Sequence, residues 1–310
     1  MKKIAVRSQI KQCARALWTA ALAGIVLWNI ENSPAAVPAD QIQKMQAAAP
    51  ETAPVTPQKA RKLLVFTLTK GFRHSSIPLA AEALKFMGQN TKAFETVITE
   101  DPAWLNAEKL KDFDAVCFDQ CTGDPFTDQE TKTALLDFVK SGKGFIGIHA
   151  ATDCFYSWKE YGEMLGGYFN GHPFGHISVK LDDPKHPLNA VFGGKGFEIS
   201  DEIYTFKKPY TRDALRILLS VDWDNSNNLK GGNRPDNDYA LSWIRDYGQG
   251  RVFYCAFGHQ EPIYWNKAVL AHYLAGVQYA LGDLKADATP TTKLNPAPEA
   301  VPGPNLAVKK

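Results

Sequence analysis

The sequence predicts an α/β fold with a mostly parallel sheet and a strand-rich extension toward the C-terminus. In the first half, short continuous apolar runs alternate with amphipathic stretches, as in parallel strands that helices cover on both faces. In the second half, apolar strand-like runs follow one another with turns between them. The composition of the 310 residues, 45% hydrophobic and 22% charged, suits a globular protein with a full-sized core.

The individual elements follow from the period of the apolar residues. A closing helix is expected over 266–281, where Val269, Leu270, Tyr273, Leu274 and Val277 share one face. Earlier helices are expected over 78–89 and 127–142. Strands are expected over 62–68, 94–99, 114–119, 144–148, 177–181, 197–206, 215–221, 239–245 and 250–257.

The two ends of the chain differ from this body. Five basic residues precede or flank the apolar stretch 16–30, and Val37 and Ala39 suit a small-residue cleavage site, so residues 1–39 are predicted to be a signal peptide cleaved after Ala39. The mature protein is then periplasmic or extracellular; the alternative is an uncleaved membrane anchor. Proline-rich composition predicts a flexible linker over 40–60 and a disordered tail over 284–310, leaving 61–283 as the folded domain.

The charge of the chain limits the partners to expect, and the positions of its cysteines indicate their state. A formal net charge of +2, with both signs spread along the chain, gives no reason to expect nucleic acid, and membrane contact is expected only through the signal segment. Cys117 and Cys255 lie in apolar strand patterns and read as buried thiols. Cys121 and Cys154 each follow a strand end, so both free thiols and a disulfide remain open for them.

Histidines collect where ligands settle in such folds, after the carboxyl ends of strands. His74, His149, His172 and His259 all occupy loop positions of this kind. His149 ends an apolar strand between small residues, the pattern of a tight strand-to-helix elbow that presents a reactive side chain. It can serve as a base, a proton donor or a metal ligand, or it can be satisfied by the backbone. By contrast, His272 lies among apolar helix positions and reads as packing.

Other polar and aromatic residues near these loops are candidates for binding. Arg73 and His74 precede a helix start and could hold an anionic or hydroxyl-rich ligand, or they could simply be solvated at the surface. Asp153 either caps the next helix or takes part in catalysis. Of the adjacent Asp201 and Glu202 in a strand, one is expected to face inward. Tyr156, Tyr204 and Trp265 suit sugar stacking, although aromatic residues are also common in cores.

Imidazoles and a carboxylate together form a set that suits a divalent metal such as zinc or manganese. The predicted ligands are His149, His172, His259 and Glu202.

Several sequence blocks together resemble the ThuA-like, or trehalose-utilisation, family over nearly all of 61–283. The most specific are "GIHAATD" at 147–153 and "NGHP" at 170–173. The resemblance implies a flavodoxin-like sandwich similar to class I glutamine amidotransferases. In those enzymes the elbow carries a catalytic cysteine, and the matching position here is His149, so glutaminase activity is not expected. No nucleotide cofactor is expected.

The family is associated with disaccharide breakdown, including routes through 3-keto sugars. The resemblance therefore implies an exported enzyme acting on a small carbohydrate, a disaccharide or 3-keto glycoside, by proton abstraction and glycosidic cleavage. His149, His259 and Asp153 are the candidate catalytic residues. Two alternatives stay open: a non-catalytic carbohydrate-binding or accessory protein on the same scaffold, and thiol-based hydrolysis through Cys154 or Cys121.

Overall fold

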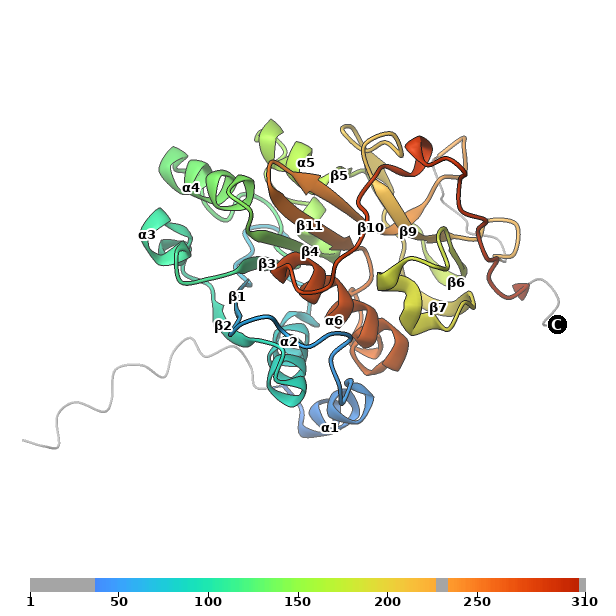
Figure 1. Ribbon diagram of the computed structural model, residues 1–310, viewed down its shortest axis with the longest axis horizontal. Coiled ribbons are helices and arrows are strands. Elements are labelled where there is room, and N and C mark those ends of the chain that lie inside the picture. Colours follow the sequence, from blue (N-terminus) through green and yellow to red (C-terminus); the bar gives the residue numbers. More distant parts are fainter. Residues whose placement is uncertain (1–36, 227–233, 307–310) are drawn as a thin grey trace, which may run out of the picture. The chain divides into compact units, whose positions relative to one another are not determined.

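The computed structural model describes residues 37–226 and 234–306, which form one nine-stranded sheet between layers of helices (Figure 1). A two-stranded sheet, β5 with β8, lies beside it. The strands are β1 (Lys62–Phe66), β2 (Glu95–Thr99), β3 (Ala115–Asp119), β4 (Gly144–Ile148), β5 (Tyr168–Phe169), β6 (Phe174–Leu181), β7 (Phe197–Glu202), β8 (Phe206–Lys207), β9 (Arg216–Val221), β10 (Ala240–Tyr247) and β11 (Gly250–Cys255).

The parallel half of the sheet has the order β2-β1-β3-β4-β11, the flavodoxin-like arrangement. β1, β3 and β4 are almost wholly buried, as their continuous apolar sequences predict. Because these strands are parallel, their carboxyl ends meet at one edge of the sheet. The predicted α/β fold with a strand-rich extension is confirmed.

The second half is antiparallel and continues as β11-β10-β9-β6-β7. Counting reversals along this order, β7 runs in the same direction as β4, so its last residue, Glu202, lies at the same edge as the end of β4. Register shifts interrupt the β10 pairing with β9 around Ala240 and Ser242. Such irregularities increase local twist and bend a sheet.

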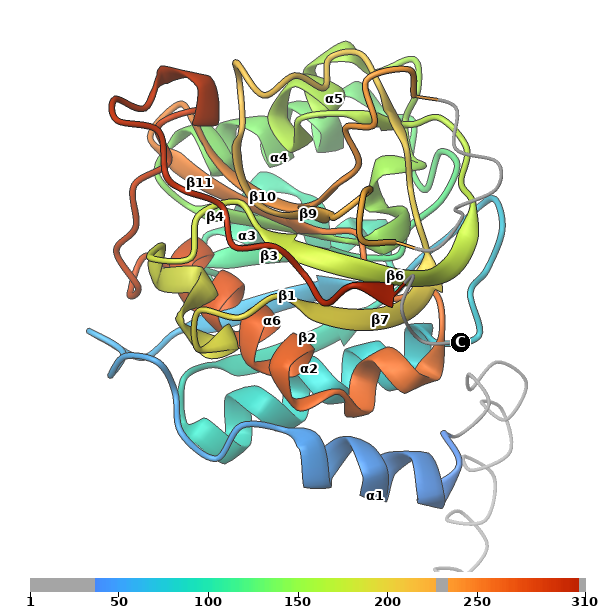
Figure 2. The same ribbon diagram turned by 90° about the vertical axis from the view of Figure 1, so that its right-hand side faces the viewer.

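Helices cover both faces of the sheet (Figure 2). α2 and α6 lie on one face with α1 outside them, and α3, α4 and α5 lie on the other. Alternate residues of one strand serve the two cores: Ile146 packs toward α2 and α6, whereas Phe145 packs toward α4. The helices are α1 (Ala39–Ala48), α2 (Ile77–Thr91), α3 (Ala107–Leu110), α4 (Gln129–Lys140), α5 (Lys159–Leu165) and α6 (Lys267–Leu281), with short 3-10 turns that include η2 (His149–Thr152) and η4 (Glu261–Trp265).

The segments that flank the domain are more ordered than their composition predicts. Within the predicted linker, α1 forms a helix that buries Met45 against the core, so the linker prediction was wrong for 40–48. The predicted disordered tail was also wrong for its described part, because Val301 and Leu181 exchange backbone hydrogen bonds and Thr291 caps the start of β9 at Ile217. Composition cannot reveal a few well-placed contacts of this kind.

The predicted signal segment falls mostly within residues 1–36, which lie outside the described residues. Across 37–226 and 234–306, the helices are too short or too polar to cross a bilayer.

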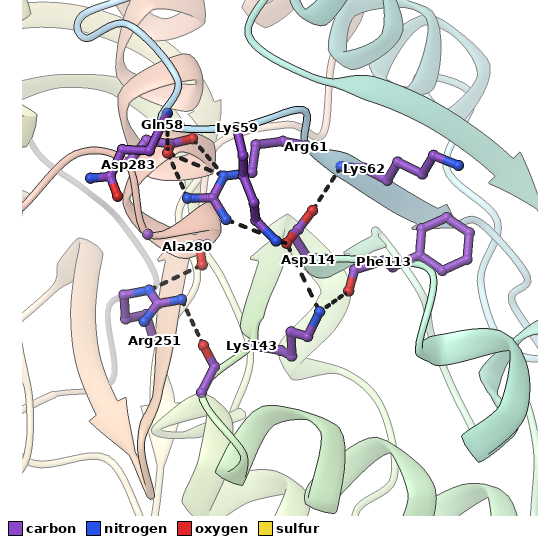
Figure 3. A network of polar contacts seen from close by, with 12 residues as sticks. Gln58, Lys59, Arg61, Lys62, Phe113, Asp114, Lys143, Arg251, Ala280 and Asp283 are labelled. Carbon is purple, nitrogen blue, oxygen red and sulfur yellow. Dashed lines mark hydrogen bonds and ion pairs between the residues drawn. The ribbon is translucent and has the colours of Figure 1, made fainter.

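A charged network ties the amino ends of the parallel strands together (Figure 3). Asp114, just before β3, accepts Lys59 at 2.7 Å and Arg61 at 3.3 Å, and Lys143, just before β4, lies 3.9 Å away. Arg61 also binds Asp283, just after α6, at 2.6 Å. This network therefore links β1, β3, β4 and α6 at the end of the sheet opposite to the histidines.

Candidate functional site

His149 occupies the elbow that the sequence predicts. It follows β4 directly and has a φ of 45°, in the left-handed region that non-glycine residues seldom adopt. The ring is fully buried, and its Nδ1 lies 2.7 Å from the backbone oxygen of Ala256. A carbonyl can only accept, so Nδ1 carries the proton and Nε2 of the neutral ring presents a lone pair. A backbone hydrogen bond that fixes the tautomer in this way is typical of metal-binding histidines.

Glu202, the last residue of the edge strand β7, lies next to His149. Its Oε2 lies 3.3 Å from His149 Nε2 and 3.0 Å from His259 Nδ1, and its Oε1 lies 3.0 Å from His172 Nδ1. In a flat sheet, the five steps from β4 to β7 would span roughly 24 Å. The sheet therefore curls, and the irregular pairing of β10 accounts for part of that curvature.

Four side chains converge at this point: His74 from the β1–α2 loop, His149, Glu202, and His259 from the loop after β11. One ligand atom from each lies within 4.8 Å of all the others. Neither nitrogen of His74 has a hydrogen-bond partner, and the same holds for His149 Nε2 and His259 Nδ1, which approach Glu202 out of line for a hydrogen bond. Unpartnered buried nitrogens around one carboxylate fit a divalent cation.

His272 shows what a structural buried histidine looks like in the same protein. It is fully buried in α6, yet its Nδ1 lies 3.0 Å from the Leu188 backbone oxygen and its Nε2 lies 2.9 Å from Ser242 Oγ. The sequence reading of His272 as packing agrees with this arrangement. Burial alone therefore does not explain the unpartnered nitrogens of His74 and His149.

The electrostatics of the cluster favour a neutral His74 beside an ionised Glu202. Burial, together with the neighbouring imidazoles of His149 and His259, lowers the pKa of His74 to about 3. Burial acts to raise the pKa of Glu202, but the contacts with His149 and His259 outweigh it and the pKa falls. Glu202 in turn raises the pKa of His259. A neutral imidazole and a carboxylate anion are the forms that bind metal.

A buried network holds the loop that carries His259. Asp201 Oδ2 accepts the Gly258 N–H at 2.8 Å, and Ser76 Oγ donates to the Gly258 oxygen at 2.8 Å. Gly258 has a φ of 140°, and a Cβ there would stand 2.7 Å from Tyr264 Oη and 3.1 Å from His149 Cβ. Only glycine allows this close approach of the loop to the elbow.

The structure brings together most, but not all, of the predicted metal ligands. His149, His259 and Glu202 converge as expected. His172 lies outside the four-residue cluster. It contacts Oε1 of Glu202, and its side chain is 41% exposed. His74, predicted for substrate binding, takes its place in the cluster. Both histidines lie on loops at the same edge, so only the three-dimensional path of the loops separates their roles.

The remaining candidates are divided between the site and the surface. The Tyr204 ring lies 4.3 Å from the His149 ring and forms a wall of the site. Asp153 accepts a hydrogen bond from Tyr156 and belongs to neighbouring structure rather than to the four-residue cluster. Arg73 pairs with Glu100 on the surface at 2.7 Å.

Trp265, the last aromatic candidate for sugar stacking, packs elsewhere. It lies against the core next to α1, with Lys44 Nζ 5.1 Å from its ring centre.

The cysteines give no support to thiol chemistry. Cys117, Cys121, Cys154 and Cys255 are all free and fully buried. Burial raises the pKa of Cys154 well above its ordinary value, which disfavours the reactive thiolate.

Comparison with known proteins identifies the family. The sequence pattern described as trehalose utilisation, ThuA, matches residues 62–280. The chain belongs to the ThuA family. A crystal structure of a Bacteroides uniformis ATCC 8492 protein described as ThuA-like is 20% identical, with a TM-score of 0.58 over 73% of this chain and 92% of that one.

A second ThuA-like crystal structure, from Parabacteroides merdae ATCC 43184, is 18% identical, with a TM-score of 0.58 over 74% of this chain and 93% of that one. At these identities the likeness shows the ThuA fold. No curated protein matches the chain.

Proposed function

We propose that this ThuA-family protein is an exported, metal-assisted enzyme that cleaves a disaccharide or 3-keto glycoside in the periplasm or outside the cell. The observation that carries the proposal is the convergence of His74, His149, His259 and Glu202, with buried imidazole nitrogens that lack a hydrogen-bond partner. The family description, trehalose utilisation, supports a carbohydrate substrate.

These four residues would hold a divalent metal, zinc or manganese by the ligand types, and that metal would supply Lewis-acid polarisation of a substrate carbonyl. The chain itself holds the ligands in place. The Ala256 oxygen fixes the His149 tautomer, and Asp201 and Ser76 fix the loop of His259.

His172 is placed to act as the base. Its Nδ1 lies 3.0 Å from Glu202 Oε1, so the carboxylate accepts that proton and leaves Nε2 with a lone pair. In a 3-keto glycoside, Nε2 takes the proton from C2, beside the carbonyl. The C2–H electron pair forms a C1=C2 double bond, the C1–O glycosidic bond breaks, and the leaving oxygen is protonated.

The test combines metal analysis with activity. The purified protein is expected to carry about one metal per chain, and His74→Ala is expected to lower metal affinity by at least roughly a hundredfold, since even outer-shell partners are worth roughly 10- to 100-fold. His176→Ala is the matched control, because this exposed histidine contacts Ser200 and Glu198 instead of the cluster.

Activity is then measured on a 3-keto disaccharide and on the plain disaccharide. Metal-dependent turnover that His172→Ala removes, with metal content kept, supports the proposal. Sugar binding without turnover would instead identify a carbohydrate-binding protein. A wild-type protein that binds no metal would overturn the assignment of the cluster.

A further inference from the structure

Two exposed phenylalanine rings, Phe72 and Phe174, lie beside the four-residue cluster. Among the described residues, the large hydrophobic side chains that stay exposed are Phe72, Tyr156, Phe174 and Ile98. Three of them lie in loops or strand ends at the carboxyl edge of the sheet, and Ile98 lies on the edge strand β2. Phe72 is 65% exposed and Phe174 is 52% exposed. Neither phenylalanine belongs to either hydrophobic core, so core packing does not account for an aromatic residue at these two positions.

Both rings stand beside the cluster. Phe72 lies edge-on to His74 with ring centres 4.8 Å apart, and parallel to His259 at 6.4 Å. Phe174, which pairs with Glu202 in the β6–β7 ladder, approaches the same His259 ring at 6.3 Å from another chain segment. The two phenylalanines thus flank His259, a member of the cluster that is partly open to solvent, with 27% of its side chain exposed.

We propose that Phe72 and Phe174 form the subsite for the leaving-group ring of a glycoside. This inference rests on the proposed function: if the keto-sugar ring reacts at the cluster, its glycosidic substituent extends outward past His259. The apolar C–H faces of a second sugar ring suit aromatic faces, and the partly exposed imidazole of His259 offers a partner for one of its hydroxyls.

The same mixture of groups argues against a protein or lipid partner. Docking of that kind needs a continuous apolar patch, whereas imidazoles interrupt the rim between the two phenylalanines. The subsite therefore selects glycosides with a cyclic leaving group over those with a small one.

The experiment compares Phe72→Ala, Phe174→Ala and the control Ile98→Ala on two substrates, a 3-keto disaccharide and the corresponding methyl 3-keto glycoside. Each phenylalanine variant is expected to raise KM for the disaccharide by about tenfold. For the methyl glycoside, KM is expected to stay within about twofold of the wild type. Circular dichroism and metal content are expected to match the wild type, because both side chains lie outside the cores.

Binding of the plain disaccharide, measured by calorimetry, separates this inference from the proposed function. Turnover of both substrates with equal KM effects, or with none, overturns the subsite and leaves the proposed function standing. Disaccharide binding that weakens in both phenylalanine variants but not in Ile98→Ala supports the subsite even if the wild type has no activity. Absence of both binding and turnover in the wild type overturns both ideas.

Discussion

The charged groups at the two ends of the parallel sheet differ in how completely they are paired. At the amino end, Asp114 and Asp283 are surrounded by Arg61 and lysines, so opposite charges meet in a closed set of ion pairs (Figure 3). At the carboxyl end, three imidazoles surround the single carboxylate of Glu202, and several of their nitrogens lack partners.

The comparison indicates that the charged groups at the amino end stabilise the fold, whereas those at the carboxyl end are available to bind a ligand. A satisfied network lowers the energy of the folded state by itself. An unsatisfied one costs stability until something binds, as is usual for functional sites. The following predictions test this division, beginning with the largest expected effect.

His149→Asn is expected to lower kcat by about a thousandfold or more, because it removes a ligand from the site. The free energy of unfolding of the metal-free protein is expected to change by less than about 1 kcal/mol. Asparagine tolerates a positive φ, and relief of strain worth roughly 1–3 kcal/mol offsets the lost packing. Kinetics and urea unfolding in chelator measure the two effects. A large loss of stability with activity retained would reverse the roles assigned to the two ends.

Asp283→Asn is expected to cost about 3 kcal/mol of unfolding free energy, because it leaves the Arg61 guanidinium without its buried partner. Metal content and KM are expected to stay unchanged. Glu108→Gln is the control: it breaks an exposed pair with Lys111 and is expected to cost less than about 0.5 kcal/mol. Equal effects of the two substitutions in urea unfolding would show that the amino-end network adds little.

Asp201→Ala is expected to weaken metal binding by roughly 10- to 100-fold, because the Gly258 N–H loses its acceptor and the loop of His259 loosens. Asp201→Asn keeps an oxygen acceptor and is expected to restore most of the affinity. Metal titration of both variants measures this. If the asparagine variant fails as badly as the alanine variant, Asp201 does not act by holding the loop.

Asp119, at the carboxyl end of β3, is a buried carboxyl group whose effect on stability should depend on pH. Burial raises the pKa of this carboxyl to about 8, against about 4 in the unfolded chain. The folded state therefore binds the extra proton, so the contribution of Asp119 to stability is full below pH 4 and is lost as pH rises toward 8.

The free energy of unfolding of the wild type should consequently fall, relative to that of Asp119→Asn, by about 1 kcal/mol for each pH unit between pH 5 and 8. Urea unfolding at four pH values measures it. A difference that stays constant with pH would mean that Asp119 is ionised in the fold.

The parallel half of the fold was predictable because it depends on local pattern. The runs at 62–68, 114–119 and 144–148 are apolar throughout, as strands covered on both faces must be. His149 was recognisable as an elbow for the same reason, since its strand ends beside small residues. The flanking segments were not predictable, because burial of Met45 and Ala48 and a backbone pairing at Val301 leave no trace in composition.

The membership of the cluster depended on long-range geometry. The sequence indicates that Asp201 or Glu202 faces inward, but both are buried, one under the loop of His259 and the other at the cluster. The curl of the sheet brings Glu202, at the end of β7, back to His149, and the paths of the loops decide which of His74 and His172 joins the cluster. No local period encodes that curvature.

The separation of the four ligands along the chain has a consequence for the order of assembly. His74, His149, Glu202 and His259 come from four distant segments, so no half of the polypeptide contains a complete binding set. Loop-closure entropy delays contacts between residues far apart in sequence. If the cluster holds a cation, as we propose, that cation would be acquired last, after the four segments have come together.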